Sequence, residues 1–189
     1  KKLLKEDINE AELFQLGFAK RLQELVEKNI EFNATNVQQM KVAGPAILAE
    51  VEEALEDYFG EYEVFSSEEM LYVPIENFNI FFKGFVDAVV KVGDTYHLFD
   101  WKTCSWGWDS RKKAEKLITY QLTLYKHFFC LKHKIDPAQV ETHFALLKRT
   151  AKKGRVEIRS VTTPFPLRAL ALKQNTLSKG CSKRASILL

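Results

Sequence analysis

Two carboxylates and one ammonium group interrupt neighbouring apolar segments of this sequence. Asp87 lies within FFKGFVDAVV, and Asp100 and Lys102 lie two residues apart within HLFDWKTC. Because alternate side chains of a strand share a face, Asp100 and Lys102 would point the same way. Carboxylate oxygens suit Mg²⁺ or Mn²⁺, and a metal-bound water beside an ammonium group is suited to phosphodiester hydrolysis. These three side chains are therefore candidates for that chemistry.

The turn between the two segments determines whether the carboxylates meet. A tight hairpin centred on Gly93 and Asp94 would place Asp87 directly opposite Asp100. Like charges on opposed residues of an antiparallel pair are destabilising, and burial adds a desolvation cost. A divalent cation between the carboxylates would offset both costs. The alternative is a buried ion pair, in which Lys102 neutralises Asp100 or Asp87.

Two polar residues lie on the apolar face of a helix that we expect over residues 110–133. Gln121 and Tyr125 are four residues apart, so they share one side of that helix with leucine, isoleucine and phenylalanine residues. Buried polar groups need hydrogen-bond partners, and a backbone carbonyl could satisfy Gln121. The functional interpretation is that this face covers the sheet at the metal site. Gln121 and Tyr125 would then hold the phosphate, the water or Lys102.

The other elements must position these residues. Apolar residues at helical spacing predict one or two helices within residues 3–28, and Gly44 with Pro45 is expected to open another helix that ends near Gly60. Strands are expected over residues 63–75, 79–92, 95–104, 140–150 and 155–161. This order predicts an α/β fold, with a mixed central sheet flanked by helices.

Length and composition are typical of one soluble globular domain over residues 1–189. The chain is 46% hydrophobic and 28% charged, and no apolar run approaches the roughly 18–20 residues that cross a bilayer. We expect a helical extension over 1–41, a core over 42–161 and a basic segment over 162–189. The charged amino-terminal residues resemble no secretory signal, so we expect a cytoplasmic location and no membrane partner. Three scattered cysteines favour neither a disulfide framework nor a metal cluster.

Charge is distributed unevenly along the chain. Residues 1–100 carry 9 basic and 20 acidic side chains, whereas residues 101–189 carry 19 basic and 5 acidic ones. A basic half favours a polyanionic partner such as nucleic acid. The alternative is that two solvated surfaces happen to differ in charge.

Three short motifs in order resemble those of a known enzyme family. GFVD (residues 84–87), FDWKT (99–103) and QLTLY (121–125) resemble the motifs of the PD-(D/E)XK nuclease superfamily, in particular its RecB-like exonuclease branch. The resemblance covers roughly residues 42–160 and implies a restriction-endonuclease-like core. It also implies a DNA substrate, single-stranded or duplex, and allows a phage-encoded protein that acts in a bacterial host.

The resemblance assigns a role to each matching residue. Asp87 and Asp100 would be metal ligands, the backbone carbonyl of Trp101 a further ligand, and Lys102 the catalytic lysine. Gln121 and Tyr125 would form the motif specific to the RecB-like branch.

The sequence departs from the family in two respects. Many relatives place a histidine or glutamate four residues after a glycine on the first core helix, but Leu48 stands at that position here. Glu52, one turn further along, or Glu50, on the flank of the same helix, is a candidate replacement; the alternative is an acidic helix exposed to solvent. The cysteine set of the iron-sulfur relatives is also missing, so we expect no iron-sulfur cluster.

Aromatic and basic residues follow the lysine. Trp106 and Trp108 could stack on unpaired bases, although loop tryptophans are often packing anchors. The basic residues at the start of the next helix are candidates for phosphate contact or for an ordinary solvated face: Arg111, Lys112, Lys113 and Lys116.

The sequence therefore predicts a Mg²⁺- or Mn²⁺-dependent deoxyribonuclease, most simply an exonuclease that leaves 5′-phosphate products. Its role would be in DNA replication, recombination or degradation, with a replication or recombination protein as a partner. Two alternatives stay open. One is a catalytically inactive DNA-binding scaffold with the same fold, and the other is a restriction-type endonuclease. The sequence predicts no oligomeric state.

Overall fold

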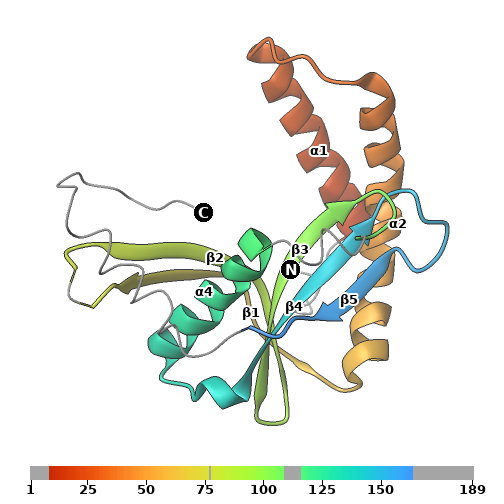
Figure 1. Cartoon of the computed structure of the whole chain (residues 1–189). Helices are drawn as coiled ribbons and strands as arrows, with labels where there is room; N and C mark the ends of the chain where they lie inside the picture. Colours follow the sequence, from red (N-terminus) through yellow and green to blue (C-terminus); the bar gives the residue numbers. More distant parts are fainter. Residues whose placement is uncertain (1–8, 77, 109–115, 164–189) are drawn as a thin grey trace. The chain divides into compact units, whose positions relative to one another are not determined.

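The computed structural model describes residues 9–76, 78–108 and 116–163. In chain order (Figure 1) its elements are α1 (Glu10–Glu27), α2 (Ala34–Phe59), β1 (Glu63–Pro74), β2 (Phe81–Val92), β3 (Thr95–Cys104), α4 (Lys116–His133), the 3₁₀ turn η2 (Pro137–Gln139), β4 (Val140–Lys148) and β5 (Val156–Ser160). The five strands are hydrogen-bonded in the order β1-β2-β3-β4-β5. β1, β2 and β3 pair antiparallel, whereas β3 and β4 run the same way. The predicted α/β fold with a mixed sheet is confirmed.

The chain divides into two compact units. The first contains α1, α2, β5 and the carboxyl-terminal ends of β3 and β4; the second contains β1, β2, α4, η2 and the beginnings of β3 and β4. No helix among the described residues is long and apolar enough to span a bilayer.

The second helix of the first unit begins earlier than the sequence analysis predicts. The side chain of Asn33 caps α2 by accepting a hydrogen bond from the backbone N–H of Asn36, and Pro45 lies inside the helix. Gly44 instead marks a close contact with α1, because a Cβ there would lie 2.1 Å from Cζ of Phe14. The predicted start at Gly44 and Pro45 is therefore wrong, and the predicted end near Gly60 is confirmed.

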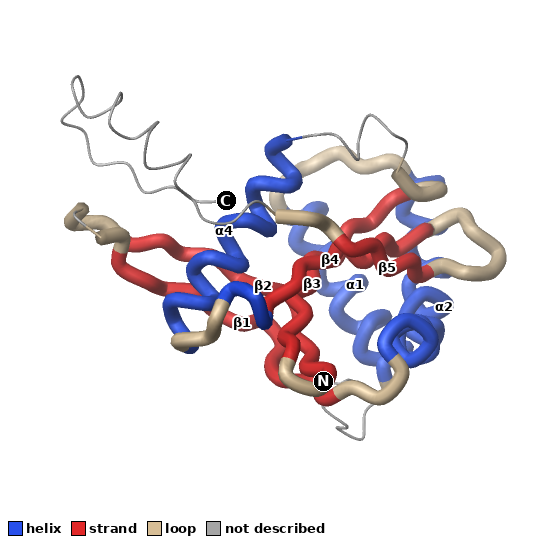
Figure 2. The backbone as a smooth tube through the Cα atoms, turned by 60° about the horizontal axis from the view of Figure 1, so that its bottom comes forward, coloured by secondary structure: helices blue, strands red, loops and turns tan. Residues whose placement is uncertain are grey.

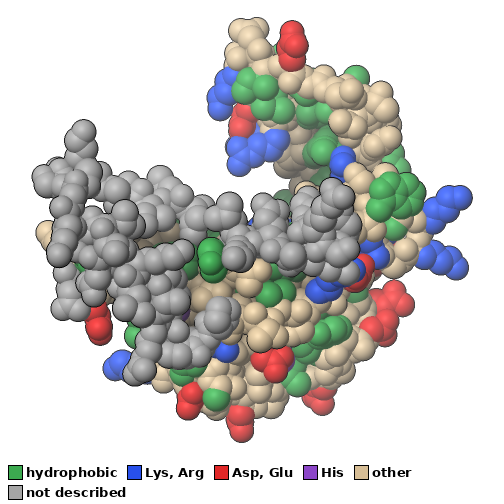
Figure 3. All heavy atoms as spheres, viewed as in Figure 1, with side chains coloured by type: hydrophobic (Ala, Val, Ile, Leu, Met, Phe, Trp, Pro, Cys, Tyr) green, Lys and Arg blue, Asp and Glu red, His purple; other side chains and the backbone are tan. Residues whose placement is uncertain are grey.

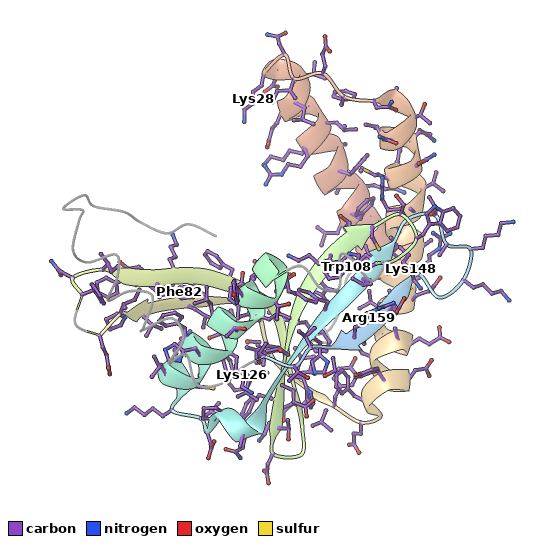
Figure 4. All side chains as sticks on the ribbon, in the orientation of Figure 1. Lys28, Phe82, Trp108, Lys126, Lys148 and Arg159 are labelled. Carbon is purple, nitrogen blue, oxygen red and sulfur yellow. The ribbon has the colours of Figure 1, made fainter. Side chains whose placement is uncertain are left out.

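The core of the first unit lies between α2 and the strands. Ala43 and Ile47 of α2 cluster with Val156 of β5, and Leu147 of β4 packs against them. On the same hairpin, Glu157 forms ion pairs with Lys148 at 3.2 Å and with Arg159. Figure 4 labels the two basic residues. The apolar cluster holds α2 on the β4–β5 hairpin.

In the second unit, α4 packs on β1 and β2 (Figure 2). Phe128 of α4 stacks on Phe82 of β2, with ring centroids 4.0 Å apart, and Phe129 is fully buried. At the end of the helix, Lys132 forms an ion pair with Glu69 of β1 at 2.5 Å. These contacts fix α4, and with it the QLTLY motif, against the sheet.

Candidate active site

The register of β2 and β3 agrees with the predicted hairpin. Gly93 has φ +57°, which a tight turn of this kind requires, and the pairing runs from Val92 opposite Thr95 to Ala88 opposite Phe99. Asp87 and Asp100 are the next residue on each strand beyond the last of these pairs. Asp87 and Asp100 thus lie next to each other in register, just beyond the Ala88–Phe99 pair of the β2–β3 ladder.

The negative charges of Asp87 and Asp100 affect the pKa of the Tyr125 hydroxyl on α4. Asp100 is buried, and Asp87 is half-buried. Burial raises the pKa of the Tyr125 hydroxyl above its usual value, and the negative charges of Asp100 and Asp87 raise it further, against the lowering effect of a hydrogen bond from Gln121. Nε2 of Gln121 donates this bond to the tyrosine oxygen over 3.0 Å. Tyr125 therefore keeps its proton at neutral pH and can donate it in a hydrogen bond.

Gly84 gives Tyr125 room against β2. A Cβ at this position would lie 3.0 Å from Cε1 of Tyr125 and 3.0 Å from Cζ of Phe82. Ordinary van der Waals contacts between carbons are about 3.5–4.0 Å, so a side chain there would have to displace both rings. The glycine of the GFVD motif thus permits the close approach of α4 to the strand that carries Asp87.

We expect Gly84→Ala to push Tyr125 away from the carboxylates. Overpacking of this kind costs about 1–3 kcal/mol, which in a chain of this size lowers the Tm by several degrees. Thermal unfolding measures the loss, and Gly17→Ala is the matched control because a Cβ there meets nothing within 4 Å. An unchanged Tm for Gly84→Ala would show that the Tyr125 ring moves aside freely.

The lysine and the tryptophan carbonyl lie on the same strand as Asp100. Trp101 and Lys102 are both half-buried residues of β3. Strand alternation predicts that Lys102 and Asp100 share a face of β3, as the sequence analysis expects. Tyr96 is four residues before Asp100, so it lies on the same face of β3. Its ring centroid lies 5.9 Å from that of Phe129, so α4 packs on this face.

The two glutamates proposed to complete the metal site differ in their surroundings. Glu50 accepts a hydrogen bond from the backbone N–H of Arg155 over 2.6 Å, and its carboxylate lies 3.6 Å from Nε of the same arginine. Glu52 is exposed. The contact with Arg155 gives Glu50 a structural role in the first unit.

The tryptophans after β3 also differ. Trp106 is 76% exposed, whereas Trp108 (Figure 4) is only 8% exposed. Trp106 is therefore available to stack on a base, and Trp108 serves packing. Of the basic residues proposed to contact phosphate, Arg111, Lys112 and Lys113 lie outside the described residues; Lys116 begins α4, but its side chain is not described.

A basic groove in the first unit was not predicted. It has a volume of about 730 Å³ and is lined by Arg149 and Arg155 of the β4–β5 hairpin, together with Gln38 and Gln39 of α2. Basic side chains project from the β4–β5 turn, as Figure 3 shows. The sequence signal was the basic stretch RTAKKGR, but only the fold places it beside polar residues of α2.

The donor set fits a hard divalent cation. Asp87 and Asp100 offer only oxygen ligands beside a neutral tyrosine, which is the ligand chemistry that Mg²⁺ and Mn²⁺ prefer. A carboxylate on each of two neighbouring strands, with a lysine two residues after the second carboxylate in a mixed sheet with helices, is typical of a class of metal-dependent phosphodiesterases.

Comparison with known proteins agrees with this class. The sequence profile of the PD-(D/E)XK nuclease superfamily matches residues 2–183, and the chain belongs to this superfamily, whose nucleases use divalent metals and act on DNA. The resemblance seen in the three motifs is confirmed at the level of the superfamily.

Two solved structures are similar to the chain at low identity. The crystal structure of SSO0001 is 13% identical, covers 90% of this chain and 73% of that chain, and has a TM-score of 0.42. A structure described as "Putative exonuclease" from Eubacterium rectale is 16% identical, covers 92% of this chain and 67% of that chain, and has a TM-score of 0.49. No curated protein matches the chain.

Proposed function

We propose that this chain is a metal-dependent DNA exonuclease of the RecB-like branch, acting in DNA replication, recombination or degradation. The observation that carries the proposal is the hydrogen-bonded Gln121–Tyr125 pair on α4, whose tyrosine ring packs against Gly84 of the strand that carries Asp87, while the hairpin register continues to Asp87 and Asp100. These residues lie in the three motifs that resemble the branch. A carboxylate pair beside paired glutamine and tyrosine side chains is suited to hold a metal and a phosphate together.

Each residue has a separate task in the proposed hydrolysis. Asp87 and Asp100 would hold Mg²⁺ or Mn²⁺, with the Trp101 carbonyl and Glu52 as further ligands. When bound, such a cation lowers the pKa of a coordinated water and neutralises charge on the phosphate. The Lys102 ammonium would orient the attacking water and stabilise the charge that develops on phosphorus.

The remaining residues would position the substrate. The Tyr125 hydroxyl, held protonated, can donate to a phosphate oxygen or to a carboxylate, while Gln121 fixes the orientation of the ring. In-line attack on phosphorus breaks the bond to the 3′ oxygen, which leaves a 5′-phosphate product. Trp106, which is exposed, would stack on an unpaired base near the scissile bond.

We expect Tyr125→Phe to slow DNA cleavage by about tenfold, because one hydrogen bond to a charged group is worth about 1.5 kcal/mol. Single-turnover cleavage of a labelled oligonucleotide measures the effect. Tyr120→Phe removes the same hydroxyl from an exposed position of the same helix and should leave the rate unchanged. Equal rates for both variants and the unmodified chain would exclude a role for the Tyr125 hydroxyl.

The experiment that tests the proposed function compares linear and circular DNA. The full chain is incubated with 5′- or 3′-end-labelled single-stranded and duplex DNA, and with closed circular DNA, in Mg²⁺, Mn²⁺ or EDTA. An exonuclease shortens the linear substrates progressively, leaves the circles intact and requires the metal. Discrete fragments and nicked circles would instead indicate a restriction-type endonuclease. Binding without any cleavage would indicate the inactive scaffold.

A further inference from the structure

Three side chains of metal-binding type meet in the second unit, at residues that the nuclease proposal does not use. Nδ1 of His97 lies 3.0 Å from Nε2 of His143. A carboxylate oxygen of Glu141 lies 3.5 Å from the first of these nitrogens and 3.8 Å from the second. Ligand atoms around a tetrahedral Zn²⁺, with bonds of about 2.0–2.2 Å, are roughly 3.3–3.6 Å apart. The triangle of ligand atoms therefore has the size that one ion requires.

The backbone places this cluster apart from the carboxylate pair. Glu141 and His143 are two residues apart on β4, so they share a face of that strand, and His97 lies on the neighbouring β3. His97 and Asp100 are three residues apart on β3, so alternation directs them to opposite faces. Phe99, on the same face as His97, stacks on His143 with ring centroids 5.1 Å apart. The cluster and the candidate active site thus lie on opposite faces of β3.

Burial and charge favour a metal at the cluster. His97 and His143 are only 7% and 1% exposed, and burial lowers the pKa of both, that of His143 to about 3. Both rings are therefore neutral at pH 7, which is the form of imidazole that binds metals. The Glu141 side chain is 55% exposed, so it supplies a negative charge and leaves the cluster accessible from solvent.

We propose that His97, His143 and Glu141 form a second metal site, which binds Zn²⁺ and ties β3 to β4. Two nitrogens and one carboxylate oxygen suit Zn²⁺ better than Mg²⁺, and water can fill the fourth position of a tetrahedral ion. A hydrogen bond shared between two neutral imidazoles is the competing explanation for their 3.0 Å separation. That explanation requires neither an ion nor Glu141.

Zn²⁺ titration of the full chain in excess Mg²⁺ tests the proposal. The chain is first depleted of metal with a chelator, and Mg²⁺ then occupies sites made of oxygen ligands without competing for imidazole. Calorimetry should detect one Zn²⁺ per chain, and the Tm should rise by about 5–10 °C when Zn²⁺ is at a hundred times its Kd. Glu141→Gln, at an exposed position where folding is not at risk, should weaken Zn²⁺ binding at least tenfold, and His97→Gln should weaken it further.

Two further variants separate this site from other sources of Zn²⁺ binding. Glu63→Gln makes the same substitution at an exposed position of β1 and should leave the Zn²⁺ affinity unchanged. Asp100→Asn should also keep it, because Asp100 belongs to the other face of β3. The proposal would be overturned by unchanged affinity in Glu141→Gln and His97→Gln, by loss of binding in Asp100→Asn, or by a folded chain that binds no Zn²⁺. None of these results depends on nuclease activity.

Discussion

Replacing Asp100 with asparagine is expected to slow metal-dependent DNA cleavage by about 10³-fold or more. The substitution removes one of two carboxylates that would hold the cation, and stabilisation of transition-state charge by a metal is worth several kcal/mol, of which about 4 kcal/mol corresponds to 10³-fold. The thermal stability of the folded chain should not decrease. Asparagine has the same shape as aspartate and can keep a hydrogen bond, while removal of the buried charge beside Asp87 relieves desolvation and like-charge repulsion, so the Tm should stay constant or rise.

This combination of lost activity and retained stability distinguishes a catalytic carboxylate from a structural one. Asp94→Asn provides the matched control, because it makes the same substitution at the exposed turn of the same hairpin and should leave cleavage unchanged. If Asp100 instead formed a structural ion pair with Lys102, Asp100→Asn would lower the Tm by several degrees. That result, with cleavage retained, would contradict the proposed role.

Replacing Lys102 with methionine is expected to slow cleavage by about 10²–10³-fold while metal binding is retained. Methionine keeps most of the apolar length of the lysine stem but removes the ammonium group that would stabilise charge at phosphorus, and loss of one such group commonly has an effect of this size. Removal of a positive charge near the carboxylates should leave the Mn²⁺ affinity unchanged or increase it. Single-turnover cleavage and Mn²⁺ titration measure the two effects separately.

The separation of the two effects is the test for Lys102. Lys20→Met, at an exposed position of α1, should alter neither the cleavage rate nor Mn²⁺ binding. A Lys102→Met chain that cleaves DNA at the unmodified rate would show that the lysine only balances the charge of Asp100. A chain that loses Mn²⁺ binding would indicate that the substitution disturbs the ligands themselves.

The β2–β3 hairpin was predictable because its determinants are local. The turn at Gly93 and Asp94 sets the register, and strand alternation then places Asp87 and Asp100 without any knowledge of the rest of the fold. The α4 face that carries Gln121 and Tyr125 was predictable for a similar reason, since helical spacing depends only on nearby residues.

Features that depend on distant parts of the chain were not predictable. Gly44 and Pro45 are typical of a helix start, but Gly44 instead accommodates Phe14 of another helix. Glu50 is bound by Arg155, which is 105 residues away, and no local pattern shows this pairing. The His97, Glu141 and His143 cluster likewise requires β3 and β4 to be neighbours. The order of strands and helices along the sequence does not tell which residues of β3 and β4 lie beside each other.

Cleavage of labelled DNA by the metal-depleted full chain, before and after addition of Mn²⁺, tests the central claim most directly. The account predicts no cleavage without metal, cleavage that begins when Mn²⁺ is added, and none in a folded Asp87→Asn chain under the same conditions. Cleavage that persists in EDTA, or that Asp87→Asn retains at the unmodified rate, would contradict the assignment of Asp87 and Asp100 as the metal-binding centre of a nuclease.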